Sequence, residues 1–168
     1  SNLAGGILII FLKPFKVGDY IIEDNNGNEG TVTDISLFYT KLQTIDEKTV
    51  ILPNGTLANT SLTNVTYTPK RLLEMKFYVT YDADWKRGLT ILEEVLKAEQ
   101  ANVSPETEVF LAELANEGVC LGGRVIIKNE EFRFARQRIT AIIKEKFDSE
   151  DISFAYPYIK IFRDEQDN

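Results

Sequence analysis

The chain has 168 residues, of which 43% are hydrophobic and 27% are charged, a composition typical of globular rather than disordered proteins. It contains no histidine and one cysteine, Cys120. This excludes histidine-based nucleophilic catalysis, His-ligated metal sites, zinc-binding Cys clusters and internal disulfides. The net charge is −7, mostly contributed beyond residue 71, which disfavours proteins whose main task is to bind nucleic acid phosphates. We expect neither enzymatic activity nor a cofactor.

The N-terminal segment 3–12 (LAGGILIIFL) is uncharged. Its length is too short for a membrane-spanning helix, which needs about 20 residues, and no basic region precedes it as in a signal peptide. Two interpretations stay open, a buried N-terminal element of a globular domain or the cytoplasmic end of a membrane helix. Because the sequence begins at Ser1 and not at methionine, we expect that further chain preceded it.

The segment 15–68 is predicted to form short strands separated by turns. The cluster Asp24-Asn25-Asn26-Gly27 favours a hairpin turn and lacks the glycine and glutamate spacing of a calcium loop. Proline followed by Asn-Gly at 53–55 predicts a tight turn that ends the fourth strand. Five strands without a long helix indicate a small closed β-barrel. The predicted strands are 17–23, 30–36, 39–45, 49–52 and 61–67.

After Pro69 the hydrophobic periodicity changes. Asp84 and Asn129 are each placed to cap a helix. The resulting order β-α-β-β-α-β is that of a ferredoxin-like sandwich, so the fold class is mixed β and α+β. The predicted elements are strand 73–81, helix 85–101, strands 107–114 and 119–128, helix 132–147, and short strands 152–156 and 158–162, which are separated by Pro157.

Basic residues on helix 132–147 leave a second function class open, a soluble Sm-like RNA-binding or oligomerisation protein. Strand 123–128 (GRVIIK) lacks the aromatic residues of an RNA-recognition strand. We therefore interpret the basic residues as a solvated helix face paired with nearby acids. Cys120 lies in an apolar strand and is interpreted as a buried structural thiol.

Five short segments occur in a fixed order along the whole chain: SNLAGG at 1–6, KPFKVGDYI at 13–21, GTV at 30–32, VILPNG at 50–55 and ISFAYP at 152–157. Together they resemble the small-conductance mechanosensitive channel (MscS-like) family. The resemblance implies a homo-heptameric, tension-gated channel of the bacterial inner membrane that releases ions and small solutes on hypoosmotic shock. This portion would face the cytoplasm as a vestibule and bind no nucleic acid.

The resemblance also implies a domain organisation. Residues 1–13 correspond to the cytoplasmic half of the third transmembrane (pore) helix, and residues 14–68 to a five-stranded Sm-like β domain. Residues 69–156 correspond to the ferredoxin-like α+β domain. Residues 157–168 correspond to a C-terminal strand, which closes a seven-stranded barrel, and a polar tail.

Site residues follow from the same resemblance. Asn2 and the segment Pro53-Asn54-Gly55 are expected to face each other and to couple the pore helix to the β domain. Gly5 and Gly6 would permit a bend in that helix. The remaining expected sites are Phe11 packed toward the transmembrane region, Lys13 and Lys16 at lipid headgroups, and the terminal barrel strand Tyr158, Ile159, Lys160, Ile161 and Phe162.

Overall fold

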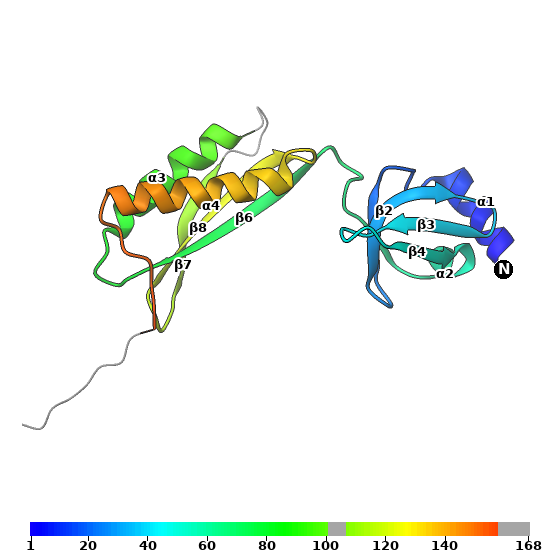
Figure 1. Cartoon of the computed structure of the whole chain (residues 1–168), viewed down its shortest axis with the longest axis horizontal. Coiled ribbons are helices and arrows are strands. Elements are labelled where there is room, and N and C mark those ends of the chain that lie inside the picture. Colours follow the sequence, from blue (N-terminus) through cyan, green and yellow to red (C-terminus); the bar gives the residue numbers. More distant parts are fainter. Residues whose placement is uncertain (101–106, 158–168) are drawn as a thin grey trace, which may run out of the picture. The chain divides into compact units, whose positions relative to one another are not determined.

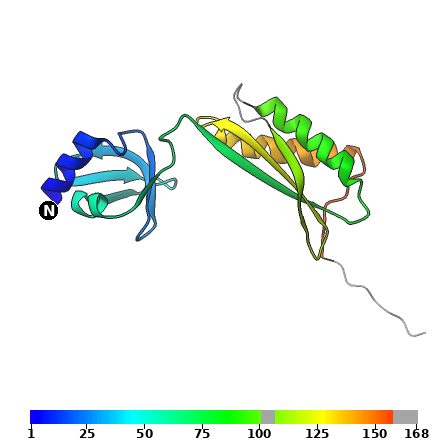
Figure 2. The ribbon, with the colours of Figure 1, turned by 180° about the vertical axis from the view of Figure 1, so that it is seen from behind.

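The computed structural model describes residues 1–100 and 107–157. The chain divides into two compact units, Ser1–Pro69 and Lys70–Asn168 (Figures 1 and 2). Both contain antiparallel sheets and helices, so the chain is a mixed α/β protein. The terminal strand expected at 158–162 lies outside the described residues. Among the helices in the described part of the chain, none has the length and apolar character needed to cross a membrane.

The first unit is a five-stranded antiparallel sheet with two helices. The strand order is β4-β3-β2-β1-β5, so β4 and β5 are the edge strands. Strand pairing therefore does not confirm the closed barrel expected from the sequence. The elements are α1 (Asn2–Leu12), β1 (Tyr20–Glu23), β2 (Asn28–Ile35), β3 (Tyr39–Gln43), β4 (Thr49–Pro53), α2 (Asn54–Asn59) and β5 (Leu62–Asn64).

The predicted turn at 24–27 is confirmed between β1 and β2. Gly27 has a φ of 69°, the left-handed region that glycine adopts without strain. The fully buried Glu23 supports the turn, because its carboxylate accepts hydrogen bonds from the backbone N–H groups of Asn25 and Asn26. Sequence reasoning had not singled out this glutamate.

The tight turn predicted at 53–55 is wrong. Pro53 does end β4, but the chain continues directly into α2. The physical reason is burial. Leu57 on α2 joins Ile9 and Phe15 in the core of the first unit, so a helical path removes more apolar surface from water than a reversal would.

The second unit packs two helices against one face of a three-stranded antiparallel sheet in the order β6-β8-β7 (Figures 1 and 2). The predicted cap at Asp84 is confirmed, because its carboxylate accepts a hydrogen bond from Arg87 N at 3.0 Å. The cap predicted at Asn129 is wrong, since residues 129–131 form a turn before the helix. The elements are β6 (Lys70–Val79), α3 (Trp85–Glu99), β7 (Glu108–Leu114), β8 (Val119–Lys128) and α4 (Phe132–Ser149).

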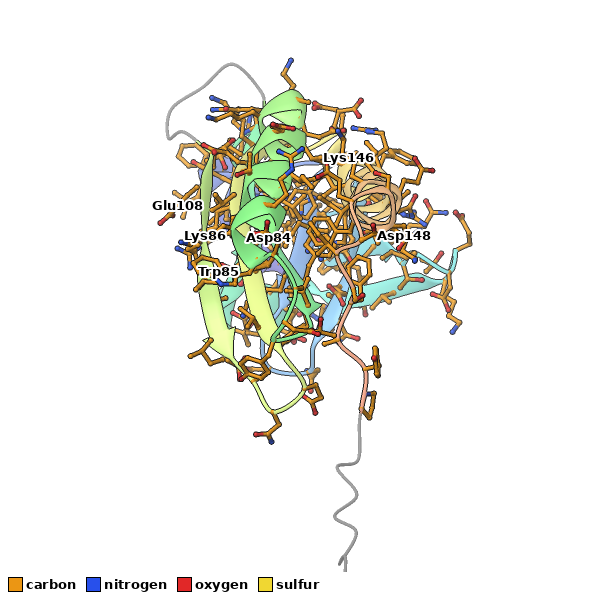
Figure 3. The ribbon with its side chains drawn as sticks, turned by 90° about the vertical axis from the view of Figure 1, so that its left-hand side faces the viewer. Asp84, Trp85, Lys86, Glu108, Lys146 and Asp148 are labelled. Carbon is orange, nitrogen blue, oxygen red and sulfur yellow. The ribbon has the colours of Figure 1, made fainter. Side chains whose placement is uncertain are left out.

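The strand predicted at 152–156 is reduced to a single bridge between Phe154 and Val79 on β6. Side-chain packing dominates this segment. The Phe154 ring stacks on Phe147 with centroids 5.3 Å apart, and Ile152 is buried in the core. Figure 3 shows this core between the helices and the sheet, with Asp84 and Trp85 where α3 begins.

Candidate functional site

Helix α1 packs closely on the rest of the first unit through two glycines. A Cβ on Gly5 would lie 2.5 Å from the carbonyl oxygen of Asn54, and one on Gly6 would lie 2.0 Å from the carbonyl oxygen of Leu37. Real Cβ atoms do not approach backbone so closely, so only glycine fits at either position. We call the surface under these glycines, formed by Leu37, Asn54 and Gly55, the helix seat.

Asn54 is the polar centre of the helix seat. It is fully buried, and its side-chain Oδ1 accepts a hydrogen bond from Thr40 Oγ1 at 2.8 Å. Its Nδ2 donates to the carbonyl of Ser36 at 2.8 Å, and its backbone N–H donates to the carbonyl of Phe38 at 2.9 Å. These bonds fix the start of α2 to the β2–β3 connection, where Leu37 lies.

The N-terminus of α1 contacts the helix seat directly. Asn2 Oδ1 accepts a hydrogen bond from the backbone N–H of Gly55 at 3.1 Å. A Cβ on Gly55 would lie 2.8 Å from that oxygen, so a side chain there would push against Asn2. The structure thus brings together Asn2, Gly5, Gly6, Asn54 and Gly55, and α1 continues through both glycines as one helix.

The opposite face of α1 is apolar and exposed within this chain. Phe11 is 85% exposed and Leu12 70% exposed. Leu3, Ile7 and Ile10 are also exposed. Because the helix carries no charged side chain, this exposed face is entirely uncharged. A surface of this kind marks contact with protein or membrane.

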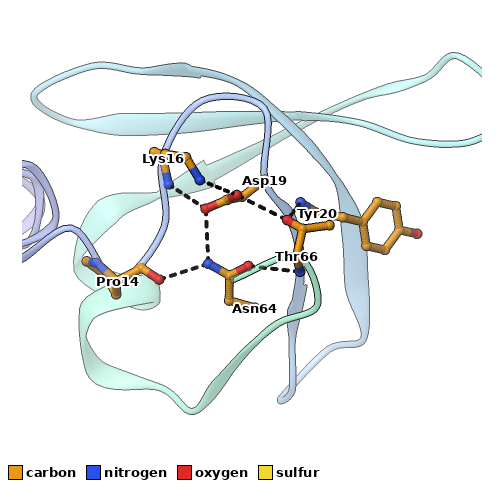
Figure 4. Close-up of polar contacts among 6 residues, drawn as sticks. All are labelled: Pro14, Lys16, Asp19, Tyr20, Asn64 and Thr66. Atoms are coloured by element: carbon orange, nitrogen blue, oxygen red, sulfur yellow. Dashed lines mark hydrogen bonds and ion pairs between the residues drawn. The ribbon is translucent and has the colours of Figure 1, made fainter. Parts of the chain in front are cut away.

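The segment after α1 is held by a buried carboxylate. Asp19 accepts hydrogen bonds from Lys16 N and Nζ, from Asn64 Nδ2 and from Thr66 Oγ1, all between 2.9 and 3.1 Å (Figure 4). Burial raises the pKa of Asp19, but these hydrogen bonds outweigh it and hold the pKa at about 2. Lys16 is thus tied to Asp19, while Lys13 ends α1 with a φ of 48°.

In the second unit, charged side chains on the helices form ion pairs. Arg138 on α4 bonds Glu99 on α3 at 2.8 Å and Glu131 at 3.1 Å. Lys144 pairs with Asp148 one turn further along α4. These pairs confirm, for Arg138 and Lys144, the interpretation of a solvated helix face paired with nearby acids.

Cys120 is fully buried, as predicted, and burial raises the pKa of its thiol. Raising the pKa disfavours the reactive thiolate. Among the described residues no group of His, Cys, Asp and Glu is arranged to hold a metal ion.

Sequence reasoning missed Leu37, which forms part of the helix seat, and Thr40 and Ser36, which hold the side chain of Asn54 there. A threonine alternating along a strand carries no signal that its hydroxyl is buried. Leu37 contacts Gly6 through its backbone carbonyl, and the type of its side chain does not predict the position of that carbonyl.

Comparison with known proteins relates this chain to a protein family. The family model described as mechanosensitive ion channel, beta-domain, matches residues 1–67. An MscS family protein of Buchnera aphidicola subsp. Schizaphis graminum is 31% identical over 163 residues, covering 96% of this chain and 56% of the relative. The chain contains an MscS-like domain.

Further similarities support this MscS-like assignment. The small-conductance mechanosensitive channel of Edwardsiella ictaluri is 27% identical over 162 residues, covering 96% of this chain and 56% of the channel. The crystal structure of Helicobacter pylori MscS in the closed state has a TM-score of 0.87 and 27% identity, covering 98% of this chain and 65% of that one. The MscS-like chain spans about half the length of these curated relatives.

Proposed function

We propose that this MscS-like chain is the vestibule portion of a tension-gated mechanosensitive channel that releases ions and small solutes on hypoosmotic shock. The proposal rests chiefly on the likeness to closed-state Helicobacter pylori MscS, which extends over 98% of the chain. The similarity to a channel of Edwardsiella ictaluri supports it. In such a channel, tension favours the open state because the open pore occupies more membrane area.

In this proposal the chain assembles as a homo-heptamer in a bacterial inner membrane, with this portion facing the cytoplasm. Residues 1–13 are the cytoplasmic half of the pore helix. Residues 14–68 form an Sm-like β domain and residues 69–156 a ferredoxin-like domain, in which the single bridge at Phe154 stands in place of a fourth strand. The terminal strand 158–162 would close a barrel with those of the other subunits, which removes exposed strand edges.

The exposed apolar face of α1 suits a membrane-side position. Phe11 would pack toward the transmembrane region, and its 85% exposure in this chain leaves it available. Lys13 follows α1 directly and would meet anionic lipid headgroups. Lys16 would contribute less to lipid binding than its charge suggests, because its ammonium group is paired with Asp19 at 2.9 Å.

Coupling between the pore and the β domain would run through the helix seat. Any movement of the pore helix at its cytoplasmic end has to carry α1 with the seat or separate α1 from it. The hydrogen bond from Gly55 N to Asn2 and the close approach of Gly5 and Gly6 are the contacts that such a separation breaks.

The test is electrical and uses the full-length protein. We expect patches from a bacterial strain without its own mechanosensitive channels to show tension-activated currents once it expresses the protein, and the strain to survive hypoosmotic shock. Light scattering of the detergent-solubilised protein should give the mass of seven subunits. Correctly assembled protein that never conducts under tension would refute the channel proposal, and another subunit number would refute the heptamer.

A further inference from the structure

We propose that the side chain of Asn54 is a positioning residue for α1, and that its bond to Thr40 sets how firmly α1 is held in the helix seat. The inference rests on the proposed function for its consequence in gating.

The first observation is that Asn54 forms one part of the helix seat and that its side chain holds the part formed by Leu37. The carbonyl oxygen of Leu37, which limits the approach of Gly6, belongs to the short connection between β2 and β3. Asn54 Nδ2 holds that connection by its bond to Ser36 O, and a Cβ on Gly6 would also lie 2.8 Å from Nδ2. Displacing the amide group would therefore move the surface that α1 touches.

The second observation is that the amide group of Asn54 is held at both ends. Thr40 is also fully buried, and its hydroxyl donates to Asn54 Oδ1. Without that donor the amide oxygen would be buried and unsatisfied, which is costly, so the group would rotate or the site would open to admit water. Either response releases Ser36 and loosens the seat.

The third observation explains why a polar side chain lies here at all. The core of the first unit, including Ile9, Leu42 and Leu57, is apolar, whereas Asn54 is polar and fully buried. A hydrogen-bonded amide adds geometric specificity that an apolar group lacks. The specificity is directed at the two backbone segments that contact α1.

The direction of the gating effect follows from the comparison. The chain, with α1 seated, resembles a closed-state channel with a TM-score of 0.87. The seated helix is therefore compatible with the closed pore. In this inference α1 leaves the helix seat when the pore opens, so a weaker seat destabilises the closed state relative to the open one. Loosening the seat should lower the tension needed for opening.

Two substitutions test the inference without changing the shape of the site. Thr40→Val removes the donor to Asn54 but keeps the volume of the side chain. Thr33→Val is the matched control, because Thr33 is exposed on neighbouring β2 and its hydroxyl bonds only to the carbonyl of Lys41 at 3.3 Å.

The first measurement is amide hydrogen exchange on the 168-residue chain. We expect Thr40→Val to speed exchange of the α1 amides by about tenfold, a factor that corresponds to about 1.4 kcal/mol. Sheet amides of β1 and β2 should exchange as in the parent, and Thr33→Val should leave α1 unchanged. Unaltered exchange in α1, or equal acceleration throughout the first unit, would overturn the positioning role.

The second measurement is the opening tension of the full-length channel. Thr40→Val should open at lower tension than the parent and than Thr33→Val. In a Gly6→Ala background, where α1 cannot seat, Thr40→Val should have no further effect on tension. An unchanged or raised threshold overturns the inference, whereas a parent without tension-activated current overturns the proposed function and leaves the exchange result to decide the role of Asn54.

Discussion

Replacing Gly6 by alanine should destabilise the first unit, although the same change stabilises most helices. In an ordinary helix interior, Gly→Ala gains roughly 0.5–1 kcal/mol because alanine loses less backbone entropy on folding. Here the new methyl group would lie 2.0 Å from the carbonyl oxygen of Leu37 and 2.8 Å from Asn54 Nδ2. Neither atom is the free end of a flexible side chain.

The size of the destabilisation depends on how far α1 has to move away from the helix seat. Ordinary van der Waals contact begins near 3.4 Å, so α1 and the helix seat would have to separate by more than an ångström at this point. Overpacking of this kind costs roughly 1–3 kcal/mol. If α1 instead lifts away entirely, the clash is relieved but Ile9, now 3% exposed, loses its burial, which costs about 1.5–3 kcal/mol. Subtracting the helix-propensity gain of roughly 0.5–1 kcal/mol from either cost, we expect a net loss of about 1–2 kcal/mol in the free energy of unfolding of the first unit.

The chain has a built-in reporter that separates the two units. Trp85 is its single tryptophan and packs against the core of the second unit, so its fluorescence follows that unit alone. Urea unfolding of Gly6→Ala should shift part of the circular dichroism transition to lower denaturant and leave the Trp85 transition in place. Ala4→Gly, on the exposed side of α1, is the control and should cost only the intrinsic helix propensity, roughly 1 kcal/mol. A Gly6→Ala chain as stable as the parent would refute the packing argument.

Three further changes test other parts of the structure. Because the pKa of Asp19 is depressed from 3.8 to about 2, its stabilising contribution of about 2 kcal/mol should be complete above about pH 5 and lost progressively as the pH falls through 2. Asp19→Asn should abolish this dependence in acid titrations of the first unit. Phe147→Ala should cost the second unit about 3–5 kcal/mol, seen as an earlier Trp85 transition with the first unit unaffected. Glu23→Ala leaves the N–H groups of Asn25 and Asn26 without their acceptor, so the first unit should lose about 1–3 kcal/mol by circular dichroism, and no loss would contradict the capping role.

Local signals in the sequence determined much of the secondary structure. Apolar spacing predicted both long helices, Asp84 was found as the cap of α3, and the cluster ending in Gly27 was found as the β1–β2 turn. Each of these depends on residues within a few positions of one another. Resemblance of short motifs also led to the MscS-like family, because the motifs occur in order along the chain.

Tertiary structure decided the features that depend on distant segments. The sequence around Pro53 favours a turn, yet burial of Leu57 against α1 and Phe15 makes a helix of the following residues. Likewise, 152–156 reads as a strand, but packing of Phe154 on Phe147 leaves one bridge.

The burial of polar residues was also decided by tertiary structure and not by local sequence. Glu23 and Asn54 look like surface residues in the sequence, and both are fully buried. The acceptor and donor atoms that make burial of Asn54 favourable come from Thr40 and Ser36, 14 and 18 residues away in the chain. The helix seat forms only when those segments and α1 pack together. Its shape is set by backbone carbonyl groups, and their positions cannot be predicted from a local pattern of side chains.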